Sequence, residues 1–81
     1  MKIHVYDTHV LTAQGQHIHF DVLVNDEHIE RVQEFAEQYL AKLKVPATEI
    51  KQHRCNFCHS EVASPNVQQQ IAEQGHSIIR L

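Results

Sequence analysis

Two stretches near the N-terminus, residues 2–11 and 16–24, alternate apolar and polar side chains. Alternation with a period of two is typical of half-buried strands, because successive side chains of a strand point to opposite faces. The residues Thr12-Ala13-Gln14-Gly15 between the stretches supply a four-residue turn. We therefore predict a β-hairpin, which requires the chain to build a sheet with at least one apolar face.

The register of this hairpin decides which side chains share a face. If Ile3 faces Val24 and Val5 faces Val22, one face is apolar. We expect this core face to collect Ile3, Val5, Ile18, Phe20 and Val22. We expect a polar cluster on the opposite face, consisting of His4, Tyr6, Thr8, His17, His19 and Asp21. Asp7 falls on the apolar side in this register, where a carboxylate needs hydrogen-bond partners close by.

The chain is rich in histidine, with 8 among 81 residues. Several of them share the predicted polar face, within reach of one another across the two strands. Imidazole titrates at about pH 6.5, so such a cluster is suited to binding a metal, accepting protons or sensing pH. The alternative is that these side chains only face solvent. No nucleophile and base can be paired from the sequence, which favours a non-enzymatic protein.

The middle of the chain predicts a long helix and a short strand. Asn25-Asp26-Glu27 offers a cap and two acids for a helix N-terminus. Apolar residues then recur at three- and four-residue steps as far as Leu43, which predicts an amphipathic helix of about 18 residues. Pro46 stops it. Residues 48–55 predict a short, partly exposed strand.

The C-terminal part predicts a second helix and a last strand. Ser64 and Pro65 form a start signal, and Gly75 is placed to end the helix. Residues 76–81 then predict a strand. The order ββαβαβ predicts one α+β domain over residues 1–81, with a small, mostly antiparallel four-stranded sheet and two helices packed on one face.

Both cysteines lie in one short stretch, Arg54-Cys55-Asn56-Phe57-Cys58-His59. Two thiolates three residues apart can chelate zinc, with His53 or His59 as a third ligand and distant histidines or another subunit completing the site. Thiol redox exchange is a second interpretation, although the predicted helix begins well beyond Cys58. Covalent haem matches the motif, but no export signal accompanies it. The remaining alternative, that the cysteines fill the core without metal, is the one that we favour.

Three separated motifs resemble those of a small bacterial family, catalogued as domain of unknown function twenty twenty-four. The motifs are His4-Val5-Tyr6-Asp7-Thr8, His19-Phe20-Asp21-Val22 and Cys55-x-Phe57-Cys58-His59-Ser60-Glu61. The resemblance covers nearly the whole chain, and it implies a compact α+β fold with a β-hairpin, helices on one side and no established activity. His9 departs from the pattern, which is expected to have an aromatic residue there.

The net charge, the N-terminal sequence and the length of the chain limit which kinds of binding partner we expect. The net charge of −3, with lysine and arginine scattered, argues against a surface that binds nucleic acid. The alternating N-terminus is neither a signal peptide nor a membrane anchor, so we expect a cytoplasmic protein with reduced thiols. Domains of this size commonly depend on a metal, a disulfide or a partner subunit. An exposed sheet face with unpaired edges therefore predicts a homodimer.

Overall fold

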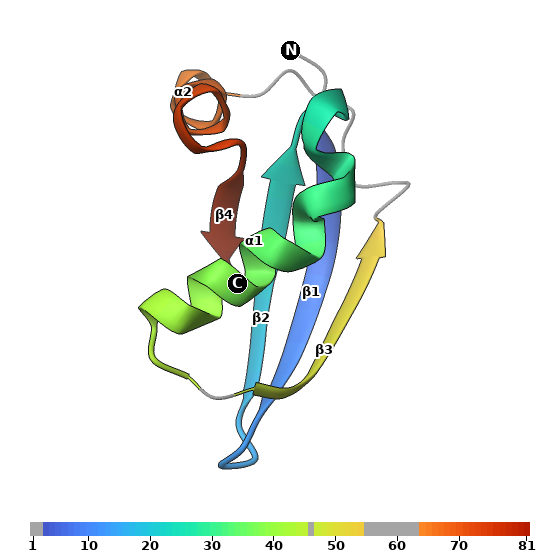
Figure 1. Ribbon diagram of the computed structural model, residues 1–81, viewed down its shortest axis with the longest axis vertical. Helices are drawn as coiled ribbons and strands as arrows, with labels where there is room; N and C mark the ends of the chain where they lie inside the picture. Colours follow the sequence, from blue (N-terminus) through green and yellow to red (C-terminus); the bar gives the residue numbers. More distant parts are fainter. Residues whose placement is uncertain (1–2, 46, 55–63) are drawn as a thin grey trace.

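The structure, a computed structural model, describes residues 3–45, 47–54 and 64–81 of the chain. Within these residues the elements follow in the order β1 (His4–Thr12), β2 (His17–Val24), the 3-10 helix η1 (Asp26–Arg31), α1 (Val32–Lys42), β3 (Ala47–Arg54), α2 (Pro65–Gln74) and β4 (Ser77–Arg80). This arrangement confirms the α+β class (Figure 1). None of the helices in the described residues is long and apolar enough to cross a membrane.

The four strands form one antiparallel sheet in the order β3-β1-β2-β4. The hairpin strands β1 and β2 therefore occupy the centre, and β3 and β4 are the edges (Figure 1). The hairpin closes on a hydrogen bond from Thr12 N to Gln16 O, at 2.9 Å. Gly15 adopts a positive φ of 83° in the loop, a conformation that glycine reaches without steric cost.

The hairpin is confirmed, but the predicted register is wrong by one residue. His4 is opposite Val24 and Tyr6 is opposite Val22, whereas Val5 was expected opposite Val22. The cause is the loop: closure between Thr12 and Gln16 leaves three residues in it rather than four. Because side chains alternate with period two, this single residue moves every side chain of β1 to the other face.

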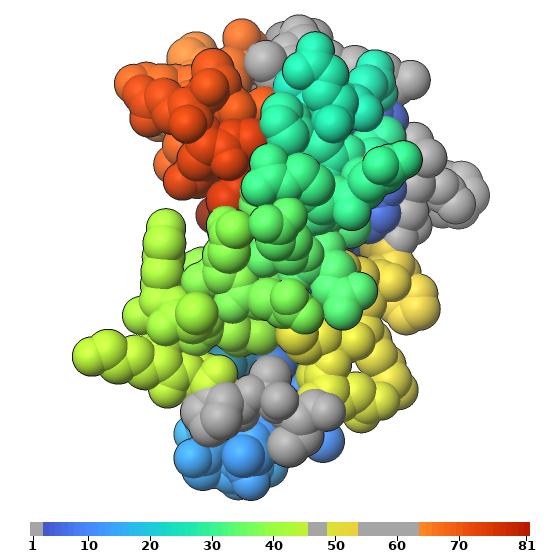
Figure 2. All heavy atoms as spheres, viewed as in Figure 1, coloured from blue at the N-terminus to red at the C-terminus, as the bar shows by residue number. Residues whose placement is uncertain are grey.

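The main core lies between the sheet and α1. It consists of Val10, Ile18, Phe20, Val22, Val24, Phe35, Ala36 and Leu40. In the space-filling view, η1 and α1 hide most of the two hairpin strands, whose turn stays visible at the bottom (Figure 2). The predicted long helix thus exists, but its first part is the 3-10 helix η1. The Asn25 side chain makes no cap hydrogen bond to the backbone, and its Oδ1 lies 2.6 Å from His28 Nδ1 instead.

The second helix has the predicted ends but a different place. Ser64 Oγ accepts a hydrogen bond from Val67 N at 3.3 Å, and Gly75 ends the helix in the left-handed conformation. Its buried Ile71 packs in a second cluster, together with Ile3, Val5 and Leu23. Of these, Val5 and Leu23 alternate along their strands with residues of the main core, so they point away from α1. The prediction that both helices pack on one face is therefore wrong: α1 covers one face, and Ile71 of α2 packs against residues of the other.

Candidate metal site on the open face of the sheet

Much of the sheet face turned away from α1 is polar and exposed to solvent. We call this surface the open face. The register places ten residues on it: Asp7, His9, Leu11, His17, His19, Asp21, Glu49, Lys51, His53 and Ile79. All ten are exposed or half-buried, whereas Ile71 of α2 covers the same face further along, at Val5 and Leu23. The centre of this surface is thus formed by the two hairpin strands.

Three side chains converge at the centre of the open face. His9 of β1 is directly opposite His19 of β2, and Asp7 lies two residues before His9 on the same face. The Asp7 carboxylate accepts hydrogen bonds from Nε2 of His19 and from Nε2 of His9, the latter at 3.2 Å. The two imidazole rings are stacked, with centroids 4.1 Å apart. One donor atom from each residue lies within 4.8 Å of the other two.

Two imidazole nitrogens and one carboxylate oxygen are a donor set for zinc and similar divalent transition metals. Bonds of about 2.0–2.2 Å to a tetrahedral ion place the donors about 3.5 Å apart, so adjustments of about 1 Å complete the site. The exposed fractions of the side chains are 36% for Asp7, 37% for His9 and 32% for His19. An ion there would have protein on one side and an open position toward solvent.

The charges of the open face suit a cation. The hydrogen bond from His19 lowers the pKa of Asp7, against the opposing effect of burial, so this carboxylate is ionised at neutral pH. Asp21 is directly opposite Asp7. Burial, followed by the negative charge of Asp7, raises the pKa of Asp21 above its usual value. Like charges in this arrangement are unfavourable, and a cation beside them relieves their repulsion.

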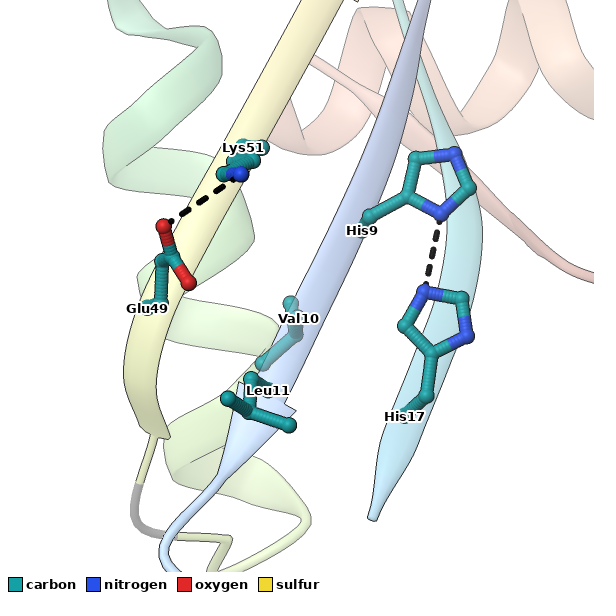
Figure 3. A pocket seen from close by; sticks show the side chains of 6 residues that line it. All are labelled: His9, Val10, Leu11, His17, Glu49 and Lys51. Carbon is teal, nitrogen blue, oxygen red and sulfur yellow. Dashed lines mark hydrogen bonds and ion pairs between the residues drawn. The ribbon is translucent and has the colours of Figure 1, made fainter. Parts of the chain in front are cut away.

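His17 fixes the orientation of the His9 ring. Its Nε2 lies 2.9 Å from His9 Nδ1 (Figure 3). The other ring nitrogen of His9, Nε2, faces Asp7. Ligand histidines commonly use their second ring nitrogen in such a hydrogen bond, which fixes the tautomer. Beside these rings is a hollow of about 210 Å³, open to solvent and lined by His9, Val10, Leu11, His17, Glu49 and Lys51 (Figure 3).

Three residues of the predicted polar face lie on the α1 side instead, because of the register. His4 is buried and its Nε2 contacts Asp26. Tyr6 packs against the main core. Thr8 is fully buried; its Oγ1 donates to Tyr6 O at 3.1 Å and accepts from Gln52 Nε2 at 3.2 Å. Each of these side chains has a structural role under the helix layer.

The predicted thiol site can be placed only in part. His53 is exposed on β3, opposite Asp7 on the open face. Cys55, Cys58 and His59 lie outside the described residues. The candidate zinc, redox and core-filling roles of the two cysteines therefore stay predictions.

Sequence reasoning missed Asp7 and His9 as members of the cluster, while His17, His19 and Asp21 lie on the predicted polar side. A signal was present in the spacing. Asp7, His9, His17, His19 and Asp21 all have odd residue numbers. Side chains alternate between faces, so any register that pairs odd-numbered residues with odd-numbered residues brings these five to one face. A three-residue hairpin loop ending in glycine is a common alternative to longer loops and gives that register.

The whole chain, residues 1–81, matches the family model described as "Domain of unknown function (DUF2024)". No curated protein and no solved structure matches the chain significantly. The family match agrees with the motifs of the hairpin and of the cysteine stretch. The chain therefore belongs to the DUF2024 family, as the resemblance predicted.

Proposed function

We propose that this domain binds a divalent transition-metal ion, zinc or an ion of similar preference, through Asp7, His9 and His19. The observation that carries the proposal is the convergence of three donor atoms from two adjacent strands within 4.8 Å. The presence of two imidazoles distinguishes the cluster from a purely acidic patch, because neutral imidazole is the commonest metal ligand in proteins.

The scaffold supports the proposal because it holds the ligands rigidly. All three residues lie on the central strands, and the neighbouring positions Thr8, Val10 and Phe20 are fully buried under α1. Sites built on packed strands vary less in geometry than sites on loops, so less ordering is required when the ion binds. Asp21 adds a second negative charge next to the ligand set.

The number of protein ligands also limits what the ion does. Structural zinc sites usually have four protein ligands, whereas three ligands leave a position for water or another molecule. The domain thus offers an exchangeable position on an exposed surface. We propose metal binding as the function, and we assign no reaction to it.

The test is metal binding by the full chain after chelator treatment, with zinc titrated against a chromophoric chelator. We expect one ion per chain, and we expect Asp7→Asn, His9→Ala and His19→Ala each to weaken binding by at least about tenfold. The matched control is His28→Ala, which removes a half-buried histidine of η1 that packs on Phe35, away from the cluster, and should leave affinity unchanged.

A second pair of variants separates this site from the cysteine stretch. Cys55→Ser with Cys58→Ser should leave zinc binding in place if the open face holds the ion. Loss of binding in the cysteine variant, together with its retention in His19→Ala, would contradict the proposal. Cobalt provides a second readout, because its absorption spectrum distinguishes nitrogen and oxygen ligands from thiolates.

A further inference from the structure

We propose that a second copy of this chain covers the open face and completes the coordination of the bound ion, so that the protein dimerises only when metal is present. The inference rests on the proposed function, because a single chain supplies three ligands and leaves one position open. A second copy brings donors that its own ion does not use, such as Asp21 and His53, to the same surface, as a two-fold symmetric interface requires.

Exposed apolar side chains flank the metal cluster on this face. Leu11 is 42% exposed and continues β1 beyond His9. Ile79, on the edge strand β4, is 43% exposed and directly opposite Asp21. The polar centre is therefore bordered by apolar residues on two sides. A partner that covers the centre removes both from water, whereas a small ligand in the open position would leave them exposed.

The charges explain why such a dimer would need the metal. Each chain carries a net charge of −3, and Asp7 and Asp21 lie side by side at the centre of the face. Two open faces brought together without metal would place six carboxylates (Asp7, Asp21 and Glu49 of each copy) and two lysines in one interface, and this excess of negative charge opposes association. Two divalent ions supply four positive charges at the same place. Metal binding thus removes the repulsion and provides the cross-link.

The size of the face leads to the same conclusion. Four strands about 4.8 Å apart and about five residues long give a surface of about 19 by 17 Å, or about 320 Å² per copy. Stable protein interfaces typically bury about 800 Å² per partner. The footprint of the sheet face is small compared with such an interface, so coordination bonds would contribute to the affinity of the dimer.

The experiment is the mass of the full chain in solution at about 50 μM, by sedimentation velocity, with chelator and with one equivalent of zinc. We expect a monomer with chelator and a dimer with zinc. Leu11→Glu and Ile79→Glu should keep the zinc stoichiometry but weaken the dimer by at least about tenfold. Leu43→Glu is the matched control: Leu43 is 39% exposed but follows α1, away from the open face, so its substitution should leave the dimer intact.

The outcomes separate this inference from the proposed function. One bound zinc per chain in a protein that stays monomeric would overturn the dimer and leave the metal site standing. No zinc binding would overturn both. A dimer in the presence of chelator would refute the dependence on metal. Equal zinc-induced dimerisation of Leu11→Glu, Ile79→Glu and the parent chain would refute the assignment to the open face.

Discussion

Asp21→Asn should have opposite effects on the metal-free and the metal-bound protein. In the metal-free protein the substitution removes the negative charge directly opposite Asp7, and it also removes the free-energy cost of burying the charge of Asp21. In the metal-bound protein it removes a negative charge next to the ion. The first effect stabilises the fold, and the second weakens metal affinity.

The magnitude follows from the cross-strand geometry. Side chains directly opposite on antiparallel strands have Cβ atoms about 5 Å apart, so the two carboxylate charges are about 6 Å apart. With an effective dielectric constant of about 40–80, Coulomb repulsion is about 0.7–1.4 kcal/mol, and salt at about 0.15 M roughly halves it. The gain in unfolding free energy is then about 0.3–0.7 kcal/mol, or an increase in Tm of about 2–5 °C for a domain of this size.

The same calculation with a divalent ion doubles the energy. If the ion of charge +2 lies at a similar distance from Asp21, the substitution removes about 0.6–1.4 kcal/mol of attraction between this carboxylate and the ion. Zinc affinity should then be weakened by about 3- to 10-fold. Thermal melts of the chelator-treated protein measure the first effect, and chelator competition measures the second. Glu30→Gln, a neutralisation in the exposed part of η1, is the control for charge alone and should leave zinc affinity unchanged. A lower Tm for metal-free Asp21→Asn, or unchanged zinc affinity, would refute the reasoning.

Three further predictions concern the α1 side of the molecule. Phe35→Ala should lower the free energy of unfolding by about 3–5 kcal/mol, because the ring is buried and stacks on His76 with centroids 4.1 Å apart. A loss below about 1 kcal/mol in urea unfolding would show that the described packing of Phe35 is wrong. Gly75→Ala should cost more than Gly15→Ala in the same assay: both have positive φ, but only at Gly75 would an added Cβ meet other side chains, at 3.1 Å. The pKa of His76 is lowered chiefly by burial and also by the positive charges of Lys42, Arg31 and His28. The contribution of neutral His76 to stability is thus complete above about pH 6.5 and is lost as the pH falls from there toward the folded pKa. His76→Phe should therefore reduce the difference in unfolding free energy between about pH 7.5 and 5.5. An unchanged difference would contradict this role of His76.

The sequence by itself determined the elements whose signals are local. The alternation along residues 2–11 and 16–24 predicted both hairpin strands, which the structure has at His4–Thr12 and His17–Val24, since alternation depends only on neighbouring positions. Ser64, Pro65 and Gly75 predicted the ends of α2 for the same reason, because caps use the chemistry of one or two residues. The family motifs and the α+β class also follow from the sequence.

Only the tertiary structure decided the faces. One residue fewer in the hairpin loop moved Asp7 and His9 to the side of His17, His19 and Asp21 and placed Thr8 in the core. It also assigned Ile3 and Val5 to a second core under Ile71 of α2, away from α1. Both arrangements of β1 alternate equally well, so the pattern does not distinguish them. The choice depends on loop closure and on packing against helices distant in sequence, and these interactions exist only in the folded chain.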